Sequence, residues 1–177
     1  HTMLVIDQSA HFEFPQPVRF AALTHDLGKA GTPPDLLPRH HGHEERSVNL
    51  CEQLCNRLRI PNECRDLAVL MARHHGNIHR AAELKATTIV KLLENTDAFR
   101  RSERFRQLLD ACRCDYTGRL GWADKPYNSP QRLLTALAAA SAIEARKIAA
   151  ACGDKTKIGE LIHTARVNAV KAALNDA

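Results

Sequence analysis

The stretch VRFAALTHDLGKAGTPP, residues 18–34, places a histidine directly before an aspartate at the end of an apolar helical run. Pro17 suits the first turn of a helix, and Gly28 is typical of the residue at which a helix stops. We therefore expect a short helix whose apolar side chains enter a core. The pair His25 and Asp26 at its end has two interpretations, a hydrogen-bonded capping pair or one half of a metal site.

Helical periodicity continues along most of the chain, and no stretch shows the alternation of a β-strand. Pro and Gly interrupt it after Gly28 and again at Pro61, where loops are expected. The sequence therefore predicts an all-α bundle of about seven or eight helices. Further helices are expected to begin near residues 44, 64 and 85, and to span about 102–115, 131–152 and 158–174.

The length of 177 residues suits one compact unit with a substantial core. We expect a core over residues 1–115 and a helical extension, residues 116–177, that packs on it. The apolar run from Leu137 to Ile143 is far too short to cross a membrane, so no membrane association is expected. Because the first residue is a histidine and not a methionine, we expect the sequence to be a piece of a longer chain.

The cysteine pattern and the net charge indicate the redox compartment of the protein and the kind of partner it could bind. The six cysteines include no CxxC pair, and Cys51 and Cys55 lie four residues apart on an apolar helical face. They are expected to be reduced core residues, which favours the cytoplasm over an oxidising compartment. The formal net charge of +5 makes a polyanion a plausible partner, although a basic surface is often only a solvated one.

Histidine is the unusual residue type in this chain. Six of the ten histidines fall in two short clusters, RHHGHE (residues 39–44) and the stretch from His74 to His79. Mixed histidine and carboxylate ligands suit Mn, Fe, Ni, Co or Mg better than a closed structural zinc site. Together with His1 and with Asp97 in the stretch NTDAF, the pair at 25–26 completes a pattern written H…HD…D.

This pattern resembles the HD superfamily of metal-dependent phosphohydrolases, which are helical bundles. The resemblance implies that His1, His25, Asp26 and Asp97 bind one divalent cation, and that His25 and Asp26 are the catalytic pair. Two His and two Asp leave coordination positions open for water and a phosphate oxygen. Asp26 could ligate the ion, or orient and deprotonate the attacking water.

Several other residues are expected to contact the substrate. His43 and His75 are the best candidates for a second metal or for phosphate, although a structural role is equally compatible with each. Lys29 can present a positive charge to phosphate or simply favour a helix end. The roles of the other clustered histidines stay open: His40, His41, His74 and His79.

A longer set of ordered motifs resembles the C-terminal HD domain of the bacterial CCA-adding enzymes, the tRNA nucleotidyltransferases. The matching stretches run in order from HTMLVIDQSA at the start through LPRHHGHE, CNRLRIPNECRDLA and TIVKLLENTDAFR to DYTGRLG, residues 115–121. In the last stretch, Gly118 and Gly121 indicate a tight loop. Arg119 is expected either to contact phosphate or to fix that loop through a salt bridge.

The resemblance implies metal-dependent hydrolysis of 2′,3′-cyclic phosphates, 2′-nucleotides and phosphomonoesters, with Ni, Mg, Mn or Co as the cation. The implied partners are the tRNA 3′ end or nucleotide phosphate esters, and a homodimer is compatible with it. The Gly-Ser and paired aspartates of a nucleotidyltransferase head are absent from these 177 residues, so nucleotide addition is not expected of them.

Two alternatives stay open at this point. The first is a helical module that binds the body of a tRNA and has little activity alone, which the basic run from Arg100 to Arg106 and the Lys-containing tail would support. The second is an HD phosphohydrolase that acts on another class of nucleotide. The motif HDLGK by itself does not separate these substrates.

Overall fold

A computed structural model describes residues 1–175, and within them it contains nine α-helices, four 3-10 turns and no β-strand. The expectation of an all-α bundle is confirmed. The chain divides into two compact units. The first comprises His1–His79 and Glu103–Tyr127, and the second comprises Arg80–Ser102 and Asn128–Ala177. The first unit thus takes residues from both sides of the expected boundary at residue 115.

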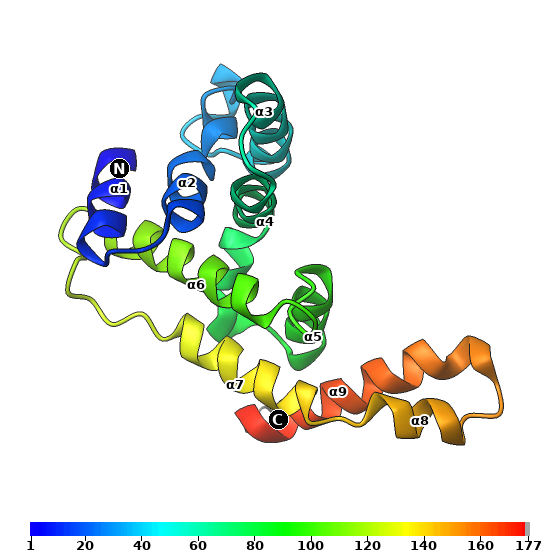
Figure 1. The fold of residues 1–177 in the computed structure, drawn as a ribbon. Helices are drawn as coiled ribbons and strands as arrows, with labels where there is room; N and C mark the ends of the chain where they lie inside the picture. Colours follow the sequence, from blue (N-terminus) through cyan, green and yellow to red (C-terminus); the bar gives the residue numbers. More distant parts are fainter. Residues whose placement is uncertain (176–177) are drawn as a thin grey trace. The chain divides into compact units, whose positions relative to one another are not determined.

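Four helices, α1 to α4, form the frame of the first unit. Helix α2 packs against both α1 and α4, and α3 lies along α4, as Figure 1 shows. Helix α6 follows in the same unit from its second residue onward. The bounds of these helices are α1 (Thr2–His11), α2 (Gln16–Thr24), α3 (His43–Leu58), α4 (Asn62–His79) and α6 (Ser102–Thr117).

A small apolar cluster ties α1, α2 and α6 together. It consists of Val5, Ala22 and Cys114, all fully buried, with Phe12 and Phe14 packed against it. Cys114 lies more than ninety residues from Val5 and Ala22 in the sequence, so the cluster brings the last turn of α6 next to α1 and α2. That juxtaposition positions the residues of the site described below.

Helix α2 ends before the histidine–aspartate pair. It has Pro15 as its N-cap and Pro17 in its first turn, and it ends at Thr24 with His25 as its C-cap. The next three residues form the 3-10 turn η1 (Leu27–Lys29), which packs against α3. The apolar run of α2 is only partly internal: Ala21 and Ala22 are buried, whereas half of Leu23 is exposed.

The contact between η1 and α3 depends on the missing side chain of Gly28. The backbone N–H of Gly28 donates to the Ser47 hydroxyl at 2.8 Å, and Arg46 donates to the Gly28 carbonyl at 3.1 Å. A Cβ atom at this position would lie 2.4 Å from two backbone atoms, the His43 oxygen and the Ser47 nitrogen. Only glycine allows this approach, which fixes the loop after Asp26.

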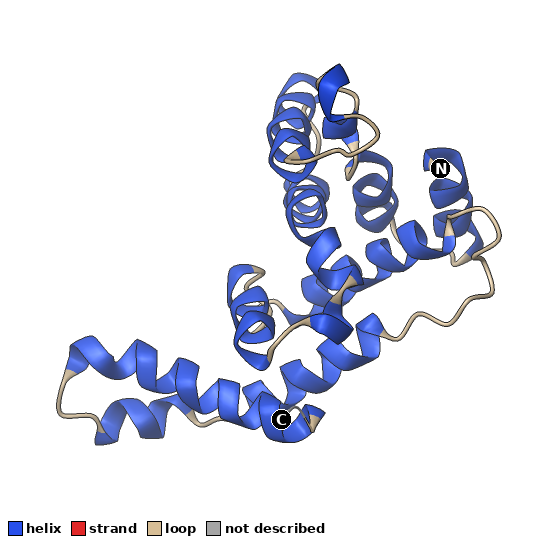
Figure 2. Cartoon of the chain, turned by 180° about the vertical axis from the view of Figure 1, so that it is seen from behind, coloured by secondary structure: helices blue, strands red, loops and turns tan. Residues whose placement is uncertain are grey.

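The second unit contains α5 (Ala86–Asn95), α7 (Ser129–Ser141), α8 (Ala145–Ala151) and α9 (Ile158–Leu174). Helix α9 contacts the other three, and it folds back along α8 to form the hairpin visible in Figure 2. The single helix expected over residues 131–152 is two helices. The break lies at residues 142–144, although the alanine-rich sequence would support one continuous helix.

All six cysteines are free, and five of them are buried, as expected for reduced core residues. Burial raises the pKa of the thiols of Cys51 and Cys114 to about 12. Only Cys152, which follows α8, is partly exposed. Among residues 1–175, no helix combines the length and the apolar content needed to cross a membrane.

The close approach at Gly28 predicts a sharp cost for a single methyl group. We expect Gly28→Ala to lower the free energy of unfolding by about 1–3 kcal/mol or more, because backbone atoms and not flexible side chains must move. Denaturant unfolding of the metal-free protein measures this loss. Gly31→Ala is the matched control in the same loop, since its new Cβ would meet no atom closer than 3.9 Å. Equal stability of the two variants would contradict this account.

Candidate metal centre

His25 is the most enclosed histidine of the first unit, with 1% of its surface exposed. Its ring nitrogen Nδ1 donates to the Ala22 carbonyl at 2.8 Å, inside the last turn of α2. The other nitrogen, Nε2, is buried and has no hydrogen-bond partner, and the same is true of Oδ1 of Asp26. Two buried polar atoms without partners on adjacent residues are costly, so a bound ligand between them is the natural explanation.

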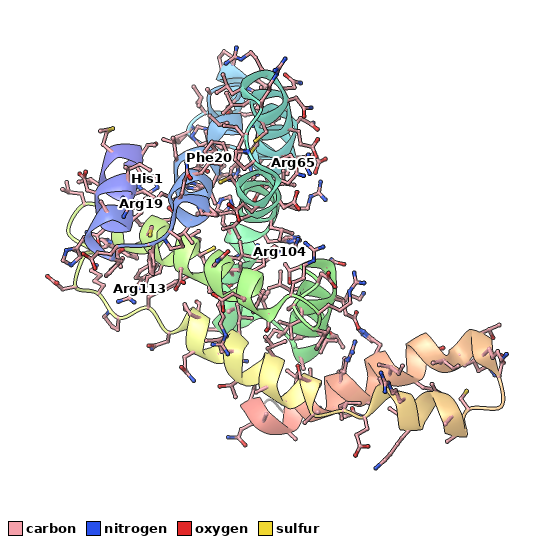
Figure 3. All side chains as sticks on the ribbon, in the orientation of Figure 1. His1, Arg19, Phe20, Arg65, Arg104 and Arg113 are labelled. Carbon is pink, nitrogen blue, oxygen red and sulfur yellow. The ribbon has the colours of Figure 1, made fainter. Side chains whose placement is uncertain are left out.

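Helices α1 and α6 bring two further ligand atoms to His25. His1 lies next to the first turn of α1, where Figure 3 labels it, and its Nε2 is 2.8 Å from Oδ1 of Asp115. That same carboxylate oxygen lies 3.5 Å from Nε2 of His25. The ligand atoms of His1, His25 and Asp115 lie within 4.8 Å of one another, a spacing that a single metal ion could bridge.

A second group of the same kind adjoins the first. It consists of Asp26, His43 and His75, whose ligand atoms also lie within 4.8 Å of one another. Oδ1 of Asp26 is 3.6 Å from Nε2 of His43 and 3.7 Å from Nε2 of His75. Because Asp26 follows His25 directly, the two groups are joined at this dipeptide.

The tautomers of these histidines favour a cation between them. Nδ1 of His43 faces the His40 carbonyl at 2.9 Å, and Nδ1 of His75 faces the Met71 carbonyl at 3.0 Å. A carbonyl can only accept, so both Nδ1 atoms carry hydrogen and both Nε2 atoms present lone pairs. These two Nε2 atoms are 3.3 Å apart. Facing lone pairs repel unless a cation or a proton lies between them, so the residues fit a divalent metal with N and O ligands.

Several side chains of the site have pKa values far from their ordinary values. Burial alone would lower the pKa of His25, but its interactions with the nearby carboxylates of Asp115 and Asp26 outweigh burial and raise the pKa to about 10. The carboxylates of Asp115 and Asp26 have pKa values well below their usual range, because their interactions with histidine and lysine outweigh burial. Burial, followed by the positive charge of His25, lowers the pKa of His75 to about 4. His75 is therefore a neutral ligand at neutral pH.

The third position of the H…HD…D pattern differs from the expectation. Asp97 lies in the second unit, beyond the end of α5, where its backbone is left-handed with φ 55°. Its carboxylate accepts two hydrogen bonds from the guanidinium of Arg100, at 2.7 and 3.0 Å, and belongs to neither group of candidate ligands. Helix α5 ends at Asn95, so the face shared with Leu93 does not extend to this residue. The carboxylate that lies beside His1 and His25 is that of Asp115 in α6.

Lys29 and Arg119 are also expected to contact the substrate. Lys29 contacts Oδ2 of Asp26 at 2.6 Å and is partly exposed. Arg119 lies over the rings of Tyr116 and Trp122, at 5.6 and 5.1 Å from their centroids. Of the two roles expected for Arg119, the loop contact is thus made through aromatic rings and not through a salt bridge, and contact with phosphate stays a prediction.

The remaining histidines divide by their partners. His40 faces the hydroxyl of Thr32 at 2.7 Å, and the carbonyl of His41 accepts from Arg46 at 2.9 Å, so both belong to the loop before α3. His74 is buried, and burial lowers its pKa to about 4. His79 contacts Oδ2 of Asp115 at 2.6 Å. Of these four, only His79 directs its ring at a carboxylate of the centre, whereas His40 meets His43 through its backbone carbonyl.

The stretch DYTGRLG contained the signal that sequence reasoning did not use. Asp115 opens it, and Gly118 accepts a contact from Nδ1 of His1 through its carbonyl at 3.3 Å. A Cβ on Gly118 would lie 2.7 Å from the Cα of Val5 in α1. Gly118 packs against α1 and thereby brings Asp115 next to His1. The sequence alone does not show that α1 is the helix against which this glycine packs.

One domain family and a group of known proteins match this chain. The HD domain family matches residues 3–117. A multifunctional CCA protein of Dechloromonas aromatica (strain RCB) is 71% identical over 176 residues, which make up 99% of this chain and 43% of that protein. A multifunctional CCA protein of Burkholderia multivorans is 54% identical over 175 residues, 98% of this chain and 42% of the relative.

The chain thus spans less than half the length of these relatives. No solved structure matches it. The family match contains most of the candidate ligands, His25, Asp26, His43, His75 and Asp115, and it ends two residues after the last of them. Since that match covers more than half of the chain, the protein belongs to the HD domain family.

Proposed function

We propose that this chain is a metal-dependent phosphohydrolase domain that hydrolyses 2′,3′-cyclic phosphates, 2′-nucleotides and phosphomonoesters, with the 3′ end of a tRNA as its macromolecular substrate. The observation that carries the proposal is the pair of buried, unsatisfied atoms on His25 and Asp26, flanked by two groups of ligand residues. The name of the relatives, multifunctional CCA protein, supports tRNA as the substrate. The six free cysteines are compatible with a cytoplasmic enzyme.

His1, His25, Asp26 and Asp115 would hold one divalent cation, for which Ni, Mg, Mn and Co are the candidates. A bound cation would supply Lewis acidity, which acidifies water and offsets the charge of a phosphate group. His43 and His75 would then contact a second cation or the phosphate itself. Asp26 lies between both groups, so it can ligate with one oxygen and orient an incoming water with the other.

Lys29 and His43 are the residues placed to receive the phosphate. Both lie within 3.6 Å of an Asp26 oxygen and are more exposed than His25 and His75. The ammonium of Lys29 would exchange part of its contact with Asp26 for a phosphate oxygen. His43 opens α3, so the N-terminal end of this 16-residue helix adds a favourable field for an anion.

The experiment that tests this function is hydrolysis of 2′,3′-cyclic AMP by the metal-stripped protein after Mg, Mn, Ni or Co is added back. We expect metal-dependent turnover, and we expect Asp26→Asn or Asp115→Asn to lower kcat/KM by on the order of a hundredfold or more, because metal-ion catalysis supplies several kcal/mol. Turnover of deoxynucleotides or guanosine polyphosphates instead would assign the domain to the second substrate class left open by its sequence.

Asp97→Asn is the matched control for that experiment. It makes the same change of charge at the aspartate that the sequence pattern favoured, and asparagine tolerates the left-handed backbone found there. We expect this variant to keep wild-type turnover. Loss of activity in Asp97→Asn with normal activity in Asp115→Asn would restore the ligand set expected from the sequence.

The protonation of His25 predicts opposite pH dependences for the metal-free and metal-loaded protein. The folded pKa of His25, about 10, exceeds its ordinary value of about 6.5, so its stabilising contribution is complete below pH 6.5 and is lost as the pH rises toward 10. The lowered pKa values of Asp26 and Asp115 give stability that is present above about pH 4 and is lost as the pH falls further.

Metal must displace the His25 proton, so we expect apparent Mn²⁺ affinity to rise with pH above 6.5 by up to about tenfold per unit. Thermal unfolding from pH 5 to 9.5, with and without Mn²⁺, measures both effects. The midpoint of the metal-free protein should fall above pH 6.5, whereas the increase caused by Mn²⁺ should grow. An increase that is independent of pH would argue against His25 as a ligand.

A second function, binding of an RNA phosphate backbone, is favoured by the distribution of charge between the two units. The first unit contains 13 Lys and Arg residues and 13 Asp and Glu residues, whereas the second contains 12 and 7. The whole formal charge of +5 therefore belongs to the second unit. A neutral unit that holds the metal centre and a basic unit that attracts polyanions suit a domain that both grips and trims an RNA.

The second unit also offers a pocket of about 570 Å³ with a basic lining. Lys85, Arg132 and Lys171 line it together with a single acid, Glu83. Arg132 is held in place by donating to the Ala81 carbonyl at 3.0 Å. A phosphate group there would face three cations next to the beginning of α5.

Removal of two of these charges should weaken RNA binding in a salt-dependent way. We expect the double variant Lys85→Ser and Lys171→Ser to bind a tRNA transcript less tightly and to reduce the slope of log affinity against log salt by roughly 1.5. Fluorescence anisotropy over a range of KCl concentrations measures the slope. The control, Arg39→Ser with Arg57→Ser, removes the same charge from exposed positions of the first unit. An equal change of slope in both double variants would show that RNA binding depends on net charge and not on this pocket.

A further inference from the structure

His79 touches the metal centre without belonging to either group of candidate ligands. It is the last residue of α4, and its Nε2 lies 2.6 Å from Oδ2 of Asp115. The other carboxylate oxygen, Oδ1, is the atom that faces His1 and His25. His79 thus occupies the side of Asp115 opposite to the candidate cation position.

The tautomer of His79 follows from its two neighbours. An ionised carboxylate can only accept, so Nε2 of His79 carries the hydrogen and donates it to Asp115. Nδ1 of a neutral imidazole then accepts, and the hydroxyl of Tyr127 lies 3.0 Å from it. A chain of two hydrogen bonds therefore leads from Tyr127 through His79 to Asp115, and its direction is fixed by the carboxylate.

The loop that carries Tyr127 is held by its own aromatic side chains. The ring of Tyr127 stacks on that of Tyr116 with centroids 4.3 Å apart and an angle of 17°. Tyr116 also meets Trp122 edge to face at 4.9 Å, and Lys125 lies over the Trp122 ring at 4.2 Å. These contacts keep the Tyr127 hydroxyl near His79, because the stack leaves its ring little freedom to rotate away.

We propose that Tyr127 and His79 are positioning residues that hold the Asp115 carboxylate with Oδ1 directed at the cation. The proposal rests on the metal centre proposed above and adds two residues that neither group of candidate ligands contains. A carboxylate with only one partner can rotate, whereas the His79 bond fixes Oδ2 and thereby the direction of Oδ1. The hydroxyl of Tyr127 in turn fixes the tautomer and the ring orientation of His79.

The test compares Tyr127→Phe with Tyr116→Phe. Each change removes one hydroxyl from the same pair of stacked rings, but only the Tyr127 hydroxyl meets His79. By isothermal titration of the metal-free protein with Mn²⁺, we expect Tyr127→Phe to weaken binding by about tenfold. Tyr116→Phe should bind as tightly as the wild type. The thermal midpoints of the two metal-free variants should agree, which separates positioning from a general loss of stability.

A spectroscopic measurement on the metal-free protein checks the direction of the hydrogen bonds from Tyr127 through His79 to Asp115. The ring ¹⁵N chemical shifts of His79, assigned by comparison with His79→Gln, should show a neutral Nε2–H tautomer with a hydrogen-bonded Nδ1. In Tyr127→Phe, the Nδ1 shift should move toward that of a free acceptor, whereas Tyr116→Phe should leave it unchanged. An unchanged shift in Tyr127→Phe would overturn the proposed bond.

The outcomes separate this inference from the proposed function. Wild-type binding of Mn²⁺ with equal affinity in Tyr127→Phe would overturn the positioning role and leave the metal centre intact. Absence of Mn²⁺ binding in the wild type would overturn both. Weaker binding in Tyr127→Phe alone, with the expected ¹⁵N shift, supports the chain from Tyr127 to Asp115.

Discussion

The structure of the site depends on one buried hydrogen bond, from Nδ1 of His25 to the Ala22 carbonyl. It uses a free carbonyl at the end of α2, where the helix no longer supplies a partner, and it turns Nε2 toward Asp26 and Asp115. Without this bond the ring could turn Nδ1 instead of Nε2 toward the two carboxylates. The glycine that follows, Gly28, keeps α3 close enough to deliver His43.

The two units combine different electrostatic strategies. In the first, opposite charges are equal in number, and the carboxylates of Asp26 and Asp115 lie beside histidines. In the second, the excess of cations is spread over exposed helices and the pocket that contains Lys85 and Lys171. The proposed chemistry on phosphate and the proposed attraction of a polyanion would therefore belong to separate parts of the chain.

Local sequence patterns were sufficient for the helices and for half of the site. The spacing of apolar residues and the positions of Pro and Gly predicted α2, α3 and α9, and the HD dipeptide predicted the place of His25 and Asp26. The pattern H…HD…D did not distinguish Asp97 from Asp115, because that choice depends on which helix packs beside α1 and α2. Only the contacts of Val5, Ala22 and Cys114 decide it, and they join segments that lie far apart in the sequence.

The cysteine distribution has a practical consequence for work on this protein. Five thiols are enclosed in cores, and the raised pKa values of Cys51 and Cys114 keep those two in the unreactive, protonated form. Cys152, partly exposed after α8, is thus the natural attachment point for a single fluorophore or spin label, without any engineered substitution. A label there would test the proposed RNA binding by the basic unit, and it would leave the candidate histidine and carboxylate ligands of the other unit chemically untouched.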